Sequence, residues 1–333
     1  MDKSRVKRVK NTILCGIVLL VLCLLSIFFG SAKMTLPEFF ASLCDIKAET
    51  PFGIIIYSIR LPRILGSIVC GMGLGMSGAL LQRITGNRMA SPGLIGVNSG
   101  AGFAVILSLI FVPSLYYLVP LFAFAGAFLS TLLIAALSRK IGLTRSTLIL
   151  VGLAFSSILS AGISLMSLLD TDVLVSYNAF SVGSVKGVKT DELVLPSVIV
   201  IAVFVLSVVF AQKFDLLALG DGTAKSLGVN SERVRIFAML LASASASCAV
   251  SFAGLLGFVG LMAPHIARYI AGERMKNLIP ASALAGACLV TAADLAGRTL
   301  FSPSEVPAGI LMALIGAPFF LCLLLFKGGK KDA

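Results

Sequence analysis

Long apolar stretches constrain the fold of this chain more than any other feature. A bilayer core about 30 Å thick is crossed by about 20 apolar residues in an α-helix, which satisfies its own backbone hydrogen bonds. Ten such stretches occur, at about residues 12–30, 64–82, 93–111, 117–137, 147–168, 192–211, 236–253, 255–270, 279–296 and 307–326. The sequence therefore predicts an all-α polytopic membrane protein with about ten transmembrane helices. The seventh and eighth stretches can also be read as one long helix, broken near Gly254.

The composition supports this class. Of the 333 residues, 58% are hydrophobic and 13% are charged, whereas about a quarter of the residues in a soluble domain are charged. The mean hydropathy is +1.04. The first stretch, 12–30, follows a basic N-terminus as a signal peptide would, but it is long and no A-x-A-like cleavage site follows it. We expect an N-terminal anchor helix there.

The distribution of Lys and Arg predicts the orientation, because these residues are enriched in cytoplasmic segments. If the N-terminus is cytoplasmic, 20 of the 27 basic residues lie on inner segments. Both termini are then cytoplasmic. The formal net charge of +12 is explained by this bias, and nucleic-acid binding is not needed to account for it.

Three arginines run against this bias. Arg60 and Arg63 lie at the outer start of the second stretch, and Arg298 lies at the outer end of the ninth. They can reach lipid phosphates or pair locally, as Asp294 and Arg298 at i, i+4 suggest. Alternatively, they form an electropositive outer rim that receives an acidic protein surface.

Glycine patterns indicate helix packing and exclude nucleotide chemistry. Gly73 to Gly78 match G-x-G-x-x-G, but they lie inside an apolar membrane stretch without the strand and acidic residue of a dinucleotide site. Gly71, Gly75 and Gly78 instead allow another helix backbone to approach closely. No Walker A motif occurs, so we expect no ATPase activity in this chain.

Metal binding and ion coupling are also disfavoured. The seven cysteines include no C-x-x-C pair, and the chain has one histidine, His265, which we interpret as structural although a gating role stays open. An ion-coupled carrier buries ionisable groups near the middle of the membrane. Asp294, near an outer end, is the one carboxylate well inside a predicted span. We therefore expect an external energy source.

The cytoplasmic loop at about 213–232 is suited to receive that energy. Leucines and glycines suggest two short helices that present apolar side chains to a partner groove; the alternative is a pair of helices that lie on lipid. The residues concerned are Asp215, Leu216, Leu217, Leu219, Gly220, Asp221, Gly222, Leu227 and Gly228.

The fifth stretch contains uncharged serines, among them Ser156, Ser157, Ser160 and Ser164. Small hydroxyl side chains either line a translocation pathway or tighten helix packing, and both readings stay open.

Several motifs together resemble one family. They are "RLPRILGSIVCGMGLGMSGALLQRITGNRMASPGLIGVNSGAG", "ALGDGTAKSLGVNSERVR", "FAGLLGFVGLMAPHIAR", "LIPASALAGACLVTAADLAGR" and "EVPAGILMALIGAPFFLCLL". In order and spacing, from about residue 50 to 326, the chain resembles the FecCD-type permeases of ABC importers for iron-siderophores, haem and cobalamin. The resemblance implies the type II importer fold, with an inverted repeat of about 60–168 against 233–326 around a span at 192–211.

The resemblance also implies partners and roles. A second permease copy or a paralogue, two ATPase subunits that bind ATP and an extracytoplasmic binding protein would complete the complex in a bacterial cell membrane. Arg60, Arg63 and Arg298 match arginines that meet glutamates of the binding protein. The loop matches the coupling helices, and the fifth stretch matches the helix that lines the pathway.

We therefore expect a non-enzymatic permease subunit that carries a bulky metal chelate, foremost a ferric siderophore, with cobalamin or haem as alternatives. An ion-coupled secondary transporter and an intramembrane enzyme are the rivals from other classes. The first would run on a proton or sodium gradient without ATP. The second is disfavoured because His, Asp and Glu residues are not clustered.

Overall fold

The computed structural model describes residues 3–30, 34–43, 45, 50–142 and 144–328, and this part of the chain is helical without strands. The long helices are α1 (Lys3–Phe28), α4 (Leu61–Thr85), α5 (Val97–Phe111), α6 (Val119–Ile141), α7 (Arg145–Leu169), α9 (Thr190–Val209), α12 (Ser231–Ala253), α13 (Val259–Ala271), α14 (Met275–Thr299) and α15 (Ala308–Gly328). Shorter helices connect them: α2 (Leu36–Leu43), α3 (Pro51–Ile54), α8 (Thr171–Val182), α10 (Ala211–Leu216) and α11 (Asp221–Ser226).

Among the described residues, seven helices are long and apolar enough to cross a membrane: α1, α4 with the turns before it, α6, α7, α9, α12 and α14. Helices α5 and α15 are apolar too, but their apolar parts, Val97–Phe111 and Ala308–Leu323, are shorter than the seven spans above. The expected count of ten full spans is therefore not confirmed.

The predicted span 255–270 is shorter than expected. Helix α12 ends at Ala253, and α13 begins only at Val259 and has 13 residues. Gly254 and Phe258 between them have φ of 69° and 62°, values that a right-handed helix cannot accommodate. The two helices are thus separate, and the chain between them is non-helical.

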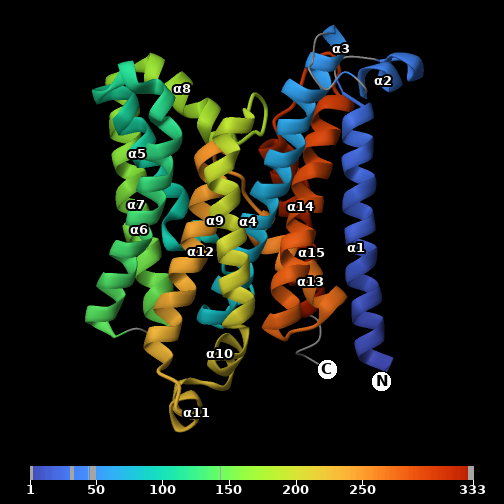
Figure 1. The fold of residues 1–333 in the computed structure, drawn as a ribbon. Coiled ribbons are helices and arrows are strands. Elements are labelled where there is room, and N and C mark those ends of the chain that lie inside the picture. Colours follow the sequence, from blue (N-terminus) through green and yellow to red (C-terminus); the bar gives the residue numbers. More distant parts are fainter. Residues whose placement is uncertain (1–2, 31–33, 44, 46–49, 143, 329–333) are drawn as a thin grey trace.

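Helix α4 lies at the centre of the molecule and packs most extensively against α14 and α12 (Figure 1). Small residues make this possible. A Cβ atom on Gly71 would collide with the backbone of Gly286, and one on Gly78 would collide with the backbone of Gly260. Gly75 approaches the carbonyl oxygen of Ser282 in the same way. The backbones of α4, α13 and α14 therefore touch directly.

Two runs of four helices have similar lengths in the same order. Helices α4 to α7 have 25, 15, 23 and 25 residues, and α12 to α15 have 23, 13, 25 and 21. Helix α4 runs away from the end that carries α2 and α3, whereas α12 runs towards that end (Figure 1). The two runs therefore start from opposite ends of the molecule.

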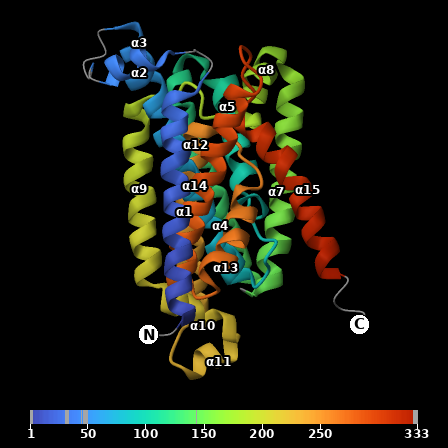
Figure 2. The same ribbon diagram turned by 90° about the vertical axis from the view of Figure 1, so that its right-hand side faces the viewer.

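The first residues of α1 and the last residues of α15 lie at one end of the molecule, together with α10 and α11 (Figure 2). Helices α2, α3 and α8 lie at the opposite end. We call the end with α10 and α11 the inner end and the other the outer end, following the orientation that the basic residues predict.

Candidate functional site

A buried ionic cluster holds the outer end together. Arg63, near the start of α4, donates from Nε to both carboxylate oxygens of Asp294 on α14, at 2.9 and 3.0 Å. Its Nη2 lies 2.8 Å from Asp294 Oδ1, and its Nη1 donates to Glu305 Oε2 at 3.1 Å. Asp294 is 3% exposed. This fork geometry is the strongest form of an arginine–carboxylate pair.

The other two arginines bind the end of α1. Arg60 Nη1 donates to the carbonyl oxygens of Ile27 and Phe28, at 2.5 and 2.8 Å. Arg298 Nη2 donates to Ser26 O at 2.7 Å, and its Nε lies 3.6 Å from Asp294 Oδ2. The last carbonyl groups of a helix lack partners within the helix and carry partial negative charge. The two arginines supply these carbonyl groups with hydrogen-bond donors and with positive charge.

The structure therefore corrects the geometry expected for Arg60, Arg63 and Arg298. Their exposed fractions are 2%, 6% and 2%, so they do not form an exposed rim in this chain. Each finds internal acceptors, and local pairing of Asp294 with Arg298 is present. Contact between these arginines and a binding protein stays a prediction.

Sequence reasoning missed two members of the cluster, Glu305 and Lys186. Lys186, on the segment between α8 and α9, has a side chain that is 65% exposed, and its Nζ lies 3.2 Å from Glu305 Oε2. Their charges were visible in the sequence, but the pairing depends on how two loops meet at the outer end.

The loop at the inner end is anchored by apolar side chains. Phe214 and Ala224 are fully buried, and Leu217, which we expected to face a partner, is 1% exposed. Leu216 is half-buried. By contrast, Leu219 and Leu227 are each 57% exposed. The expectation of exposed leucines is thus wrong for Leu217, because this first residue of the turn after α10 packs its side chain into the core.

Two carboxylates connect this loop to the long helices. Asp215 accepts from the backbone N–H of Met275, the first residue of α14, and lies 3.1 Å from Arg83 Nη2 near the end of α4. Asp221 accepts from Arg235 Nη2 on α12 at 2.8 Å. A displacement of α10 and α11 would therefore act on α4, α12 and α14 together.

Glycines shape the rest of the loop. Gly220 and Gly228 have φ of 94° and 77°, which glycine adopts without strain. Gly228 ends α11: its N–H donates to Lys225 O, and the next N–H, of Val229, donates to Ala224 O. Gly222 has open space around it. Asp221 is the first residue of α11, but its carboxylate binds Arg235 and caps no backbone group that the structure records.

Helix α7 is exposed or half-exposed along most of its length. Ser157, Ser160 and Ser164 lie on the exposed side, and Ser156 is half-buried. The Oγ atoms of Ser157 and Ser164 donate to the carbonyl oxygens of Leu153 and Ser160. The hydroxyl groups of Ser157 and Ser164 are therefore satisfied by their own helix, and the exposed serines give α7 a small, uncharged face.

No group of three His, Cys, Asp or Glu side chains that could hold a metal ion occurs in the described part of the chain. His265 is buried on α13, with ring centroids 5.6 Å from Tyr269 and 6.0 Å from Phe319. These aromatic contacts fit a packing role for the ring.

Comparisons with known proteins identify the family. The model of the FecCD transport family matches residues 18–326. The chain belongs to the FecCD transport family. It is 37% identical over 320 residues to the Fe(3+)-citrate import system permease protein YfmE of Bacillus subtilis, covering 96% of each chain. It is 34% identical over 332 residues to the hemin transport system permease protein HmuU of Yersinia pestis, covering 98% of this chain and 99% of that one.

A solved structure agrees. An inward-facing conformation of a putative metal-chelate type ABC transporter superposes with a TM-score of 0.83 at 31% identity, over 96% of this chain and 99% of that one. This FecCD chain thus has the type II importer permease fold, and the family and fold that its motifs predicted are confirmed.

Proposed function

We propose that this FecCD permease carries a ferric chelate of the siderophore class across a bacterial cell membrane, powered by a separate ATPase. The loop at the inner end carries this proposal. It presents Leu219 and Leu227 to a partner, while Asp215 and Asp221 connect it to three central helices. Such a loop can transmit movement that the chain cannot generate itself. Relatives that import ferric citrate and hemin support the cargo class, and haem or cobalamin is the alternative within the family.

The test is reconstitution of the permease with its ATPase and binding protein in vesicles, with ferric siderophore uptake as the measurement. Leu219→Asp with Leu227→Asp should separate the ATPase from the permease and abolish uptake. Leu133→Asn, at an exposed position about two turns before the inner end of α6, serves as the control. Normal ATPase stoichiometry in the double variant would favour the lipid-lying alternative for the loop. Uptake driven by a proton or sodium gradient without ATP would favour the ion-coupled rival.

A second copy or a paralogue would cover α7. In a single chain this helix exposes apolar side chains such as Leu150, Ile158 and Leu168, between which Ser157, Ser160 and Ser164 lie. Two such faces around an axis would enclose an uncharged pathway with hydroxyl groups along it. Ser160→Trp should block uptake and leave the complex assembled. Unchanged uptake would leave helix packing as the role of these serines.

Docking of a binding protein belongs at the outer end. Lys186 is an exposed cation there and is connected through Glu305 to Arg63, whereas the three arginines are buried in this chain. We therefore propose that Lys186 meets carboxylates of the binding protein first and that the arginine cluster supports it from within. Lys186→Glu should abolish the stimulation of ATPase activity by the binding protein. Undiminished stimulation would exclude Lys186 from docking.

The two runs of four helices support an inverted repeat, α4 to α7 against α12 to α15, with α9 and the coupling loop between them. Half-length helices α5 and α13 take equivalent places in the two runs. In this arrangement the irregular segments directly before α5 and α13, at 90–96 and 254–258, consist of buried or half-buried residues, and irregular backbone inside protein is tolerated at membrane depth.

A further inference from the structure

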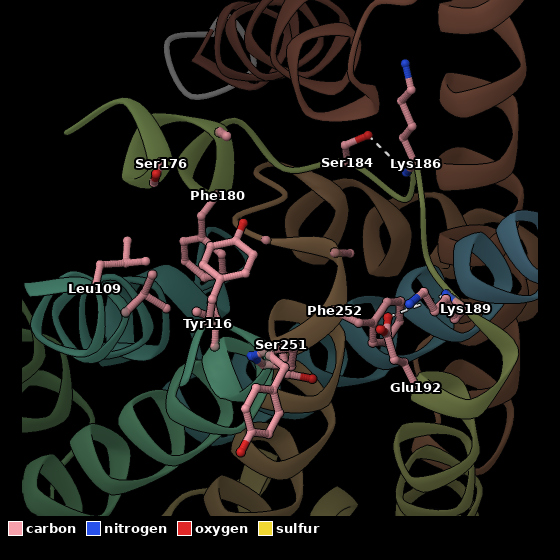
Figure 3. Close-up of a pocket in the computed structure, with 17 residues that line it drawn as sticks. Leu109, Tyr116, Ser176, Phe180, Ser184, Lys186, Lys189, Glu192, Ser251 and Phe252 are labelled. Atoms are coloured by element: carbon pink, nitrogen blue, oxygen red, sulfur yellow. Dashed lines mark hydrogen bonds between the residues drawn. The ribbon is translucent and has the colours of Figure 1, made fainter. Parts of the chain in front are cut away.

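A cavity of about 490 Å³ opens at the outer end between α6, α8, α9 and the end of α12 (Figure 3). Its wall is rich in aromatic side chains: Tyr116, Tyr117, Phe180 and Phe252. Lys189 and Glu192 lie together on one side of the cavity in Figure 3, beside Phe252. Lys186 also lines it, but its Nζ atom pairs with Glu305. The cavity thus combines aromatic faces with two cations, of which Lys186 is paired with Glu305, and one carboxylate, Glu192.

A second cavity, of about 350 Å³, adjoins the first and shares Tyr117, Glu192, Ser251 and Phe252 with it. It is a slot between α6 and α9 whose floor is α12. Apolar side chains dominate the slot, for example Phe124 on α6 and Ile199 on α9. Both volumes fall within the range of about 300 to 1,000 Å³ that is typical of small-molecule sites.

The slot opens to the surface of helices that face the bilayer. Leu121 on one flank is 57% exposed and Leu195 on the other is 66% exposed. The slot is lined along α9 from Asp191 to Ile199, which are eight residues apart. At 1.5 Å per residue this is about 12 Å, less than half of a bilayer core of about 30 Å. Its depth therefore fits within a single leaflet.

We propose that these two cavities bind one phospholipid of the outer leaflet with a zwitterionic headgroup. One acyl chain lies in the slot between α6 and α9, and the headgroup lies in the aromatic cavity above. There the phosphate meets Lys189, while the ammonium group meets Glu192 and the aromatic faces. Asp191 beside Glu192 makes the rim of the slot unfavourable for a headgroup that carries only negative charge.

Retention of lipid on the full chain tests this proposal. The permease is reconstituted in vesicles of equal phosphatidylethanolamine and phosphatidylglycerol, purified in detergent and analysed by native mass spectrometry. We expect one phosphatidylethanolamine per protomer. Ile199→Trp fills the slot and should lower the retained fraction at least about tenfold, an affinity change of about 1.4 kcal/mol. Val198→Trp, at a neighbouring position that does not line the slot and is 60% exposed, should retain the lipid.

Equal retention by Ile199→Trp and Val198→Trp would overturn the slot, as would a wild-type protomer without lipid or with metal chelate in its place. A second measurement holds if Ile199→Trp fails to fold. The chain has no tryptophan, so Phe124→Trp places the sole one in the slot. Phosphatidylethanolamine with a brominated acyl chain should quench its fluorescence at about tenfold lower mole fraction than it quenches that of Leu129→Trp, which faces bulk lipid. Equal quenching would overturn the proposal.

The headgroup assignment has its own test. Glu192 accepts from the backbone N–H of Lys189 at the start of α9, and Glu192→Gln keeps an acceptor oxygen for it. This variant should retain lipid but lose the preference for phosphatidylethanolamine over phosphatidylglycerol. Asp172→Asn, an exposed carboxylate at the outer end that does not line either cavity, should keep the preference. An unchanged preference in Glu192→Gln would exclude the zwitterionic headgroup.

Discussion

At the outer end, Arg63 and Asp294 pair with side chains that are 8% and 3% exposed, whereas at the inner end the carboxylates Asp215 and Asp221 are 33% and 55% exposed, and their partners Arg83 and Arg235 are 16% and 2% exposed. The same chemistry thus occurs in two settings. Breaking a buried pair leaves an uncompensated charge in a dry environment, which costs several kcal/mol. At the inner end water can replace the bond on the side of the exposed carboxylate, which lowers the cost of breaking the pair. We therefore expect the outer cluster to be rigid and the inner carboxylates to rearrange more easily.

The difference also separates what each end can offer a partner. The outer arginines donate their hydrogen bonds to Asp294, Glu305 and the end of α1, so they hold helices together. The inner carboxylates hold a loop whose Leu219 and Leu227 stay exposed. Force applied to that loop reaches α4, α12 and α14, while the outer cluster keeps α4 and α14 in register.

The largest expected effect comes from removing Asp294 from the buried outer cluster. Asp294→Ala removes the shared partner of Arg63 and Arg298 and leaves both buried, so we expect the free energy of unfolding to fall by about 3–5 kcal/mol. Thermal unfolding of the purified protein in detergent measures this change. Asp172→Ala, an exposed control, should stay within about 0.5 kcal/mol of wild type. A loss below about 1 kcal/mol in the free energy of unfolding for Asp294→Ala would show that the cluster contributes little to stability.

Arg60→Gln should have a smaller and more local effect. It frees the carbonyl oxygens of Ile27 and Phe28, and hydrogen bonds from a charged donor are worth about 1.5–3 kcal/mol. Hydrogen exchange should accelerate at least about tenfold near the end of α1 while α14 stays protected. Arg139→Gln, which breaks the exposed pair with Glu232 at the inner end, should change neither region. Uniform acceleration would mean that Arg60 stabilises the whole bundle and not α1 alone.

Asp215→Ala tests the bonds between the loop and the long helices at the inner end. It removes the acceptor of Met275 N–H and the partner of Arg83, and we expect a loss of about 1 kcal/mol, as for a helix cap. ATP-driven uptake should fall much further than stability, because the loop is then detached from α14. Asp215→Asn keeps an acceptor oxygen and should retain more uptake than Asp215→Ala. Parallel losses of uptake and stability would contradict a coupling role.

The sequence predicted the order of the long helices and their bounds to within a few residues for α4, α9 and α14, because hydropathy depends on each segment alone. Burial of Leu217 could not be predicted, since it depends on the tertiary packing of the turn after α10. The burial of Arg60 and Arg298 could not be predicted for a similar reason. Their acceptors at the end of α1 are backbone carbonyl groups, which every residue has, and only the packing of α1 on α14 brings them within reach. The length of α13 depends on the positive φ of Phe258, and a phenylalanine in a sequence gives no sign of a positive φ.

Lys186→Gln should have the smallest effect on stability, within about 0.5 kcal/mol, because the side chain is 65% exposed and Glu305 keeps Arg63 as a partner. If docking uses this cation, stimulation of the ATPase by the binding protein should nevertheless fall. Lys189→Gln is a control of equal charge change on the same segment and should leave stimulation near wild type. A large loss of stability in Lys186→Gln would show that this lysine stabilises the outer cluster. Loss of stimulation alone would show that Lys186 contacts the binding protein while the buried arginines stabilise the fold.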